Sequence, residues 1–239
     1  MTRSCQPPEA GSAPKTAAQP PNRRAIMNAF VNNVTSFQQF LNPAAPQSRR
    51  HRVGPVDLQV NQLDGFNHLL ASLGWSSAPL TLDQVASAAR ALTPSDATAP
   101  LAPYIRAQLD RGRVLSTMVA DADWQPVNDC AATARAVVAY LDSDAGLIPN
   151  WVPRVGRLDD ALVVEAGWTA LAPEVLDFQD FCRLRTFEAQ LRGVAAGGFP
   201  FSRHEWQATR RAEAILREQQ RALRQRFLRS APMSQFRVH

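Results

Sequence analysis

Residues 140–163, YLDSDAGLIPNWVPRVGRLDDALV, contain two prolines four residues apart, a glycine soon after them, and a pair of aspartates that opens an apolar run. A proline disfavours helical geometry in the residue before it, so Ile148 and Val152 are expected to be extended. A helix that ends near Leu141 therefore cannot continue through this stretch. The pattern predicts a rigid elbow between two helices.

The residue types in this elbow are explained without any ligand. The apolar side chains are expected to pack inward, so we predict that Ile148 and Trp151 are largely buried. Asp159 and Asp160 fall in the first turn of the next helix, where a negative charge contributes about 0.3–1 kcal/mol by complementing the exposed N–H groups. The predicted structural elbow comprises Ile148, Pro149, Trp151, Pro153 and Gly156.

The same stretch carries a family resemblance. Its motif is a helix ending in tyrosine-leucine, then a serine, Leu147-Ile148-Pro149, Pro153, Gly156 and Leu158-Asp159-Asp160. This motif resembles the YkvA-like family, a bacterial helical domain without an established function, over about residues 134–164. The resemblance implies a small all-helical domain and no particular reaction. The chain departs from the family pattern, with Asp144 and Gly146 in place of a proline and an aspartate, and with Asn150 in place of an aspartate.

Acidic and amide side chains of the elbow form the sharpest chemical hypothesis. Hard divalent cations such as magnesium or calcium prefer several oxygen ligands, and the elbow could bring Asp144, Asn150, Asp159 and Asp160 together. Such a site would support a cation-dependent module or an enzyme. The alternative is that these aspartates are ordinary helix caps and surface charges. The sequence contains no nucleotide-binding glycine motif and no zinc-protease motif, and we identify no catalytic residue.

The last predicted helix, over about residues 202–229, contains eight arginines and three glutamates. Ser202 and Glu205 form a capping box at its start. Apolar residues share one side of it, namely Ala208, Ala212, Ile215, Leu216, Leu223 and Phe227. The opposite side carries Arg210, Arg217, Arg221 and Arg224. One interpretation is a helix whose apolar stripe packs on the core while the arginines face solvent; the other is a docking face for phosphate groups of lipid or nucleic acid, or for an acidic partner.

The remainder of the chain predicts other helices and no convincing strand. Helical periodicity extends over Leu63–Leu73, over the segment capped by Thr81 and Gln84, and over residues 101–118, where Gly112 is a candidate interruption. Two helices are expected after the elbow, near residues 158–171 and 174–192. The predicted fold is an all-α, irregular multi-helix bundle with a central helix–elbow–helix hairpin.

Composition bounds the function classes. The 239 residues carry a net charge of +5, and the three cysteines form neither a metal motif nor a disulfide framework, as is typical of a reducing cytoplasm. The expected order is a disordered tail over 1–26, an N-terminal helix over 27–42, a basic linker over 43–58, a helical region over 59–122, a YkvA-like helical core over 123–198, a basic C-terminal helix over 199–230 and a tail over 231–239.

These patterns favour a non-enzymatic interaction or scaffold protein. We expect it to be cytoplasmic and peripheral to the inner membrane through the basic amphipathic C-terminal helix, with an anionic membrane surface or an unknown protein as its partner. No transmembrane segment is predicted, because no run of about twenty apolar residues exists. We expect no cofactor for this interaction protein. The alternatives are a cation-dependent module or enzyme at the elbow, for which a divalent cation is the candidate cofactor, and a non-specific nucleic-acid binder.

Overall fold

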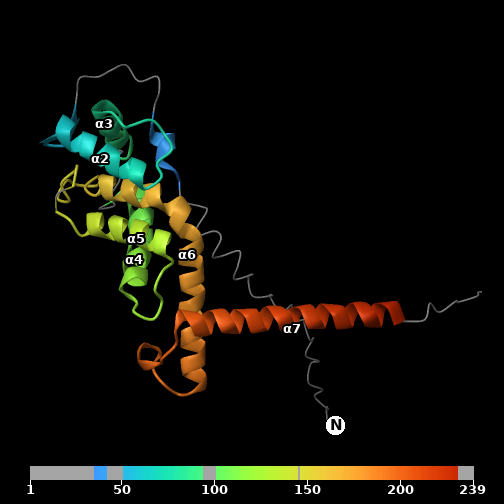
Figure 1. The fold of residues 1–239 in the computed structure, drawn as a ribbon. Helices are drawn as coiled ribbons and strands as arrows, with labels where there is room; N and C mark the ends of the chain where they lie inside the picture. The colour runs from blue at the N-terminus through green and yellow to red at the C-terminus, as the bar shows by residue number, and fades with distance from the viewer. Residues whose placement is uncertain (1–34, 42–50, 94–100, 145, 231–239) are drawn as a thin grey trace, which may run out of the picture. The chain divides into compact units, whose positions relative to one another are not determined.

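The computed structural model describes residues 35–41, 51–93, 101–144 and 146–230. These residues form six α-helices, two 3-10 helices and one small hairpin, which confirms the predicted all-α fold (Figure 1). The predicted tails over 1–26 and 231–239 and most of the predicted helix over 27–42 lie outside the described residues. Of that helix, the structure describes a 3-10 turn, η1 (Phe37–Phe40), whose Phe37 is fully buried.

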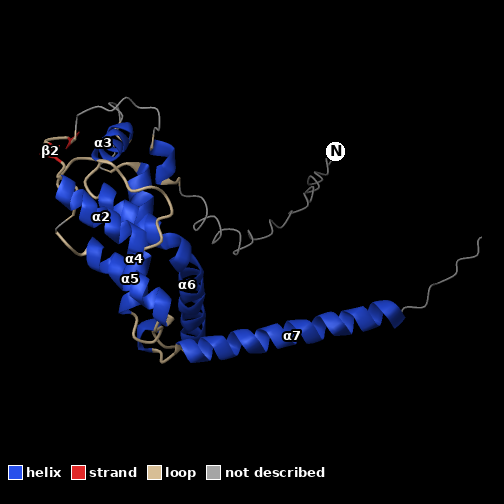
Figure 2. Ribbon diagram, turned by 45° about the horizontal axis from the view of Figure 1, so that its top comes forward, coloured by secondary structure: helices blue, strands red, loops and turns tan. Residues whose placement is uncertain are grey.

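The core lies among three helices, α4 (Pro103–Ala120), α5 (Asn128–Leu141) and α6 (Leu158–Leu191), which pack against one another (Figure 2). Gly112 does not interrupt α4. It is buried, and a Cβ atom added there would lie 2.8 Å from a methyl carbon of Leu141 and 3.3 Å from one of Val164. The missing side chain therefore permits α4 to approach the neighbouring helices closely.

The helix after the elbow is longer than predicted. We expected a break between Leu171 and Glu174, but α6 continues through Pro173 and bends along its length in Figure 1. A proline inside a helix removes one hydrogen bond and commonly kinks the helix. Pro173 is exposed, whereas Leu171 and Val175 on either side are fully buried, so packing of the flanking residues holds the helix together across the defect.

Two shorter helices, α2 (Val60–Ser72) and α3 (Leu82–Ala91), complete the bundle on the N-terminal side. The predicted capping box of α3 is present, since the backbone N–H of Gln84 donates to the Thr81 hydroxyl and the backbone N–H of Thr81 donates to the side-chain oxygen of Gln84. Leu63, Phe66 and Leu70 of α2 are buried, as the predicted periodicity requires. The local sequence signals are therefore sufficient to place these helices.

The predicted basic linker over 43–58 is wrong in its second half. Strands β1 (Arg52–Val53) and β2 (Val56–Asp57) pair antiparallel there, although we expected no strand. Val53 and the following Leu58 are buried, so this segment contributes to the core. Two-residue strands are too short to show alternation, which explains why periodicity did not reveal them.

Candidate functional site

The elbow, whose described residues are 142–144 and 146–157, joins α5 to α6 and is shaped by its own turns. The backbone N–H of Val152 donates to the carbonyl of Pro149 at 3.0 Å, and that of Gly156 donates to the carbonyl of Val152 at 2.8 Å. A Cβ atom at Gly156 would lie 2.6 Å from the Val152 carbonyl oxygen, so only glycine fits this approach. Ile148 is fully buried, as predicted. The turns, the close approach at Gly156 and the burial of Ile148 together define the path of the elbow.

Trp151 corrects one prediction for the elbow. Its side chain is 66% exposed, although we expected it to be largely buried. Ile148, just before the first proline, and Val152, just before the second, already face the core, and the tight turn that begins at Pro149 leaves Trp151 outside. Apolar character alone did not indicate which side of such a turn a residue occupies.

Asp159 fastens the elbow to α5. Its Oδ2 accepts a hydrogen bond from the Tyr140 hydroxyl at 2.8 Å and another from the Ile148 backbone N–H at 3.2 Å. Burial raises the pKa of Asp159 above its ordinary value, although these hydrogen bonds act in the opposite direction. Burial of the Tyr140 hydroxyl, followed by the negative charge of Asp159, raises the pKa of Tyr140. Asp159 therefore does more than complement the helix terminus.

Asp160 makes a separate contact on the other side of the elbow. Its Oδ2 accepts from the Arg157 Nε at 2.6 Å, and the Arg157 Nη2 also donates to the Leu141 carbonyl at 3.4 Å. The Asp160 side chain is only 5% exposed, and this burial raises its pKa to about 6. The hydrogen bond and the charge of Arg157 act in the opposite direction but do not outweigh the burial. The pair links the first turn of α6 to the last turn of α5.

The four residues that we proposed as cation ligands have different surroundings in the structure. Asp159 and Asp160 are buried and engaged by different protein donors, whereas Asp144 and Asn150 are exposed. Within the part of the chain that the structure describes, no group of three or more histidine, cysteine, aspartate or glutamate side chains could hold a metal ion. Structural contacts therefore engage one carboxylate oxygen of each buried aspartate, Asp159 Oδ2 and Asp160 Oδ2.

Glu165 forms a polar centre that sequence reasoning missed. Its carboxylate accepts from the Ser36 hydroxyl and from the Tyr104 hydroxyl, each at 2.6 Å, and from the Phe37 backbone N–H at 3.0 Å. Burial and then the charge of Glu165 raise the pKa of Tyr104. More than a hundred residues separate Glu165 from Ser36, so no local motif could reveal the contact. This carboxylate attaches η1 to the core.

The last helix, α7 (Arg203–Ser230), is attached to α6 through its first two turns. The capping box is present, because the Ser202 hydroxyl accepts from the Glu205 N–H at 3.3 Å and the Ser202 N–H donates to the Glu205 carboxylate at 2.6 Å. Arg203 forms an ion pair with the buried Glu174 of α6 and lies 4.3 Å above the ring of Trp124. The start of α7 is therefore held by both charge and aromatic packing.

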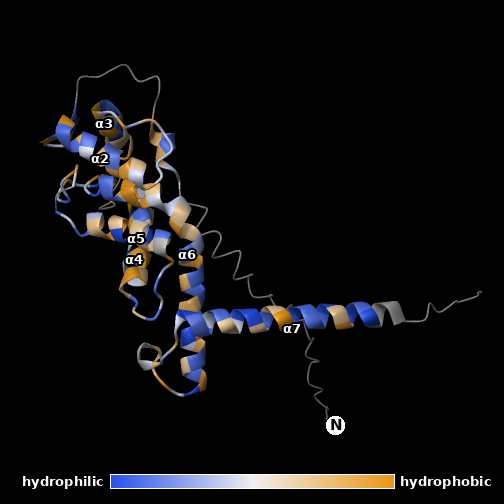
Figure 3. Cartoon of the chain, in the orientation of Figure 1, coloured by the Kyte–Doolittle hydropathy of each residue, from blue (hydrophilic) through white to orange (hydrophobic). Residues whose placement is uncertain are grey.

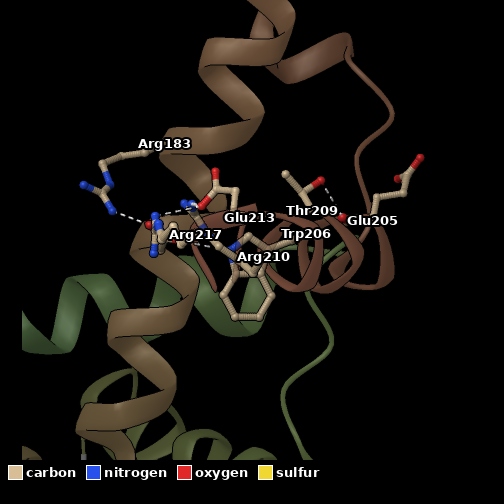
Figure 4. Close-up of polar contacts among 8 residues, drawn as sticks. Arg183, Glu205, Trp206, Thr209, Arg210, Glu213 and Arg217 are labelled. Carbon is tan, nitrogen blue, oxygen red and sulfur yellow. Dashed lines mark hydrogen bonds and ion pairs between the residues drawn. The ribbon is translucent and has the colours of Figure 1, made fainter. Parts of the chain in front are cut away.

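Asp180 of α6 makes the second attachment (Figure 4). It accepts from the indole Nε1 of Trp206 at 2.8 Å and from the Nε of Arg210 at 2.5 Å. Partial burial raises the pKa of Asp180, but the hydrogen bonds from Trp206 and Arg210 and the nearby arginine charges outweigh it and leave the pKa below its ordinary value. Arg203, Trp206 and Arg210 thus define the side of α7 that faces α6, which we call the docking side.

The predicted arginine side of α7 continues this docking side. Arg217, Arg221 and Arg224 follow Arg210 by seven, eleven and fourteen residues, which are close to two, three and four helical turns. Arg217 donates to Glu213 at 3.1 Å, and Arg210 contacts both Glu213 and Asp180. Beyond Glu213, every described side chain from residue 214 to residue 226 is exposed.

The interpretation that the apolar stripe of α7 packs on the core is wrong. Ile215, Leu216 and Leu223 are each more than half exposed, and Ala208 and Ala212 are exposed as well. These residues lie opposite the docking side, so they face away from α6. Figure 3 shows the resulting alternation of hydrophobic and hydrophilic colour along α7. We call Ala208, Ala212, Ile215, Leu216 and Leu223 the outer stripe.

Among the described helices, none combines the length and the apolar character needed to cross a membrane. Comparison of the chain with protein-family models, with curated proteins and with solved structures finds no match. The functional inference therefore rests on the two faces of α7 and on the elbow.

Proposed function

We propose that this chain is an interaction protein that binds the surface of an anionic lipid membrane through α7. The observation that carries the proposal is the exposed outer stripe on an arginine-rich helix. Six arginines and two glutamates lie between Arg211 and Ser230, so this part of the helix carries a net charge of +4 by sequence. A helix with an apolar face and an excess of basic residues is suited to the membrane interface.

Both faces contribute to the proposed binding. Complete burial of a leucine or isoleucine side chain is worth about 1.5–3 kcal/mol, so the half-exposed Ile215, Leu216 and Leu223 each offer about 1 kcal/mol on contact with lipid. A basic residue near an anionic membrane adds about 1 kcal/mol. With the outer stripe against the acyl boundary, Arg211 lies on the flank of α7 and can reach lipid phosphates. Arg217, Arg221 and Arg224 lie on the opposite side of the helix and attract the anionic surface through the longer-range electrostatic field.

Nucleic acid would make favourable contacts with only one side of α7. It would attract the arginines but would leave Ile215, Leu216 and Leu223 in water. By sequence α7 has only two aromatic residues, Trp206 and Phe227, and Trp206 is buried, so base stacking is not favoured. A lipid surface uses the charge and the outer stripe together, and we therefore favour it.

The bundle then acts as a scaffold that carries α7. We infer that its elbow is a YkvA-like hairpin. The order of the motif residues supports this assignment, as does the rigid connection between α5 and α6 that Ile148, Asp159 and Asp160 hold in place. In this proposal the elbow has a structural role and α7 has the binding role.

Vesicle co-sedimentation tests the proposal. We expect the protein to bind vesicles that contain phosphatidylserine, to bind phosphatidylcholine vesicles much more weakly, and to lose binding as salt is raised. Replacement of Arg217, Arg221 and Arg224 by glutamate should abolish binding without lowering the melting temperature, since all three side chains are exposed. The matched control replaces three other exposed arginines by glutamate, namely Arg90 on α3, Arg106 on α4 and Arg135 on α5.

A second variant separates lipid from nucleic acid. Replacement of Ile215, Leu216 and Leu223 by serine leaves every charge in place. Vesicle binding should fall more than tenfold, because about 3 kcal/mol of apolar contact is removed. Binding to duplex DNA or RNA that survives this triple change, with no vesicle binding by the parent protein at low salt, would overturn the membrane proposal.

A further inference from the structure

A second exposed apolar surface lies at the C-terminal end of α6. Phe187, Leu191 and Val194 are between 47 and 67% exposed. Phe187 and Leu191 are four residues apart, so they share one side of the helix, and Val194 follows just after the helix ends at Leu191. We call these three residues the α6 tip. Large apolar side chains gathered at such a terminus indicate a surface with an interaction role.

The α6 tip and the outer stripe of α7 face the same direction. Phe187 and Leu191 follow Asp180 by seven and eleven residues, or two and three turns, so they lie on the side of α6 that carries Asp180. Asp180 contacts the docking side of α7 through Trp206 and Arg210. The outer stripe is on the opposite side of α7. Consequently the direction from α6 toward α7 at their crossing is also the direction in which the α6 tip and the outer stripe face.

Arginines accompany the α6 tip as they accompany the outer stripe. Arg183 and Arg192 retain about half of their side-chain exposure, with Arg183 paired to Asp180 and Arg192 paired to Glu188. The Arg192 guanidinium also lies 4.6 Å above the ring of Phe199 in the loop that leads to α7. An apolar surface edged by exposed guanidinium groups matches the chemistry of an anionic lipid surface.

We propose that the α6 tip is a second contact with the same anionic bilayer, an inference that rests on the function proposed above for α7. Because α7 lies between α6 and the membrane at the crossing, the tip is set back by about one helix diameter, roughly 10 Å. This places Phe187, Leu191 and Val194 at the level of the lipid headgroups, while the outer stripe reaches the acyl boundary. The tip therefore adds affinity and fixes the orientation of the bundle on the surface.

The test compares vesicle affinity in three proteins. Replacement of Phe187 and Leu191 by serine should weaken binding to phosphatidylserine vesicles about fivefold, which is less than the loss on removal of the outer stripe. A matched control replaces the exposed apolar residues Val60 and Val127, on α2 and just before α5, and should bind as the parent does. Melting temperatures should be unchanged in both, since all four side chains are exposed.

The outcomes separate the two proposals. If the outer-stripe variant loses binding and the α6-tip variant binds as tightly as the parent, the tip inference is overturned and the function of α7 stands. If the parent does not bind anionic vesicles at low salt, both fail. Analytical sedimentation without lipid tests whether a second copy of the chain binds the α6 tip instead. If the parent self-associates and the Phe187 and Leu191 changes abolish this association, the tip pairs with another chain and the proposed lipid contact is overturned.

Discussion

Replacement of Asp160 by asparagine should change how stability depends on pH. Burial raises the pKa of Asp160 from 3.8 to about 6 in the folded protein. The folded state therefore binds this proton more tightly than the unfolded chain does, and between these two pH values it holds more protons. Under this condition the free energy of unfolding falls as pH rises, and the loss is complete above the folded pKa. One pKa unit corresponds to about 1.4 kcal/mol, so the window from pH 3.8 to about 6 corresponds to about 3 kcal/mol.

The asparagine variant removes the titration and keeps the size of the side chain. Its amide oxygen can still accept from Arg157, and Arg157 retains 36% of its side-chain exposure, so its charge stays hydrated. We expect the variant to be at least as stable as the parent at neutral pH and to be relatively less stable near pH 4. Asp159, whose pKa burial also raises, contributes in the same direction in both proteins.

Urea unfolding at several pH values between about 4 and 8 measures this difference. The asparagine variant of the exposed Asp64 on α2 supplies the control for the loss of one carboxylate from the surface. Parallel stability profiles for the parent and the Asp160 variant would refute the reasoning, because they would show that the buried carboxylate titrates alike in the folded and unfolded chain.

Four further predictions concern the elbow, Glu165, the predicted N-terminal tail and divalent cations. Ile148→Ala should cost about 2–5 kcal/mol of stability by emptying a core position, whereas Trp151→Ala should cost less than about 1 kcal/mol, as measured by urea unfolding. Glu165→Gln should destabilise the fold by about 1.5–3 kcal/mol, since a charged acceptor for several donors is lost; an unchanged melting temperature would contradict this. Removal of the residues before Met27 should leave the melting temperature nearly unchanged, and a loss of several degrees would contradict the predicted tail. Magnesium, calcium, manganese or chelator should not shift the melting temperature, and a shift that the asparagine variant of either elbow aspartate abolishes would restore the cation site.

The sequence predicted those features that short-range chemistry determines. The capping boxes at Thr81 and Ser202 each depend on residues three apart, and both are present. The turn at the elbow depends on Pro149 and Pro153, whose effect on the preceding residue is local. Ile148 is buried as predicted for the same reason, since an extended connector between two packed helices must turn one side toward them.

Long-range packing decided the features that the sequence did not predict. Pro173 ought to end a helix, yet buried neighbours on both sides keep α6 continuous. Glu165 is one carboxylate within an apolar run, and its role depends on Ser36 and Tyr104, which are distant in sequence. Proline propensity and hydropathy describe a residue and its near neighbours, so neither carries information about such partners.

The orientation of α7 shows this limit most directly. Its periodicity identifies an apolar side and an arginine side. Because burial of apolar area stabilises a fold, the apolar side is the one expected to pack on the helical bundle. The structure packs the second, because Glu174 and Asp180 on α6 offer partly buried carboxylates to Arg203 and Arg210 and because Trp206 provides apolar contact on the arginine side. The apolar contact that folding leaves unused on Ile215, Leu216 and Leu223 is then available to an external surface. An exposed stripe of this kind is a liability in solution unless a partner covers it, which is the physical reason to search for that partner among anionic membranes.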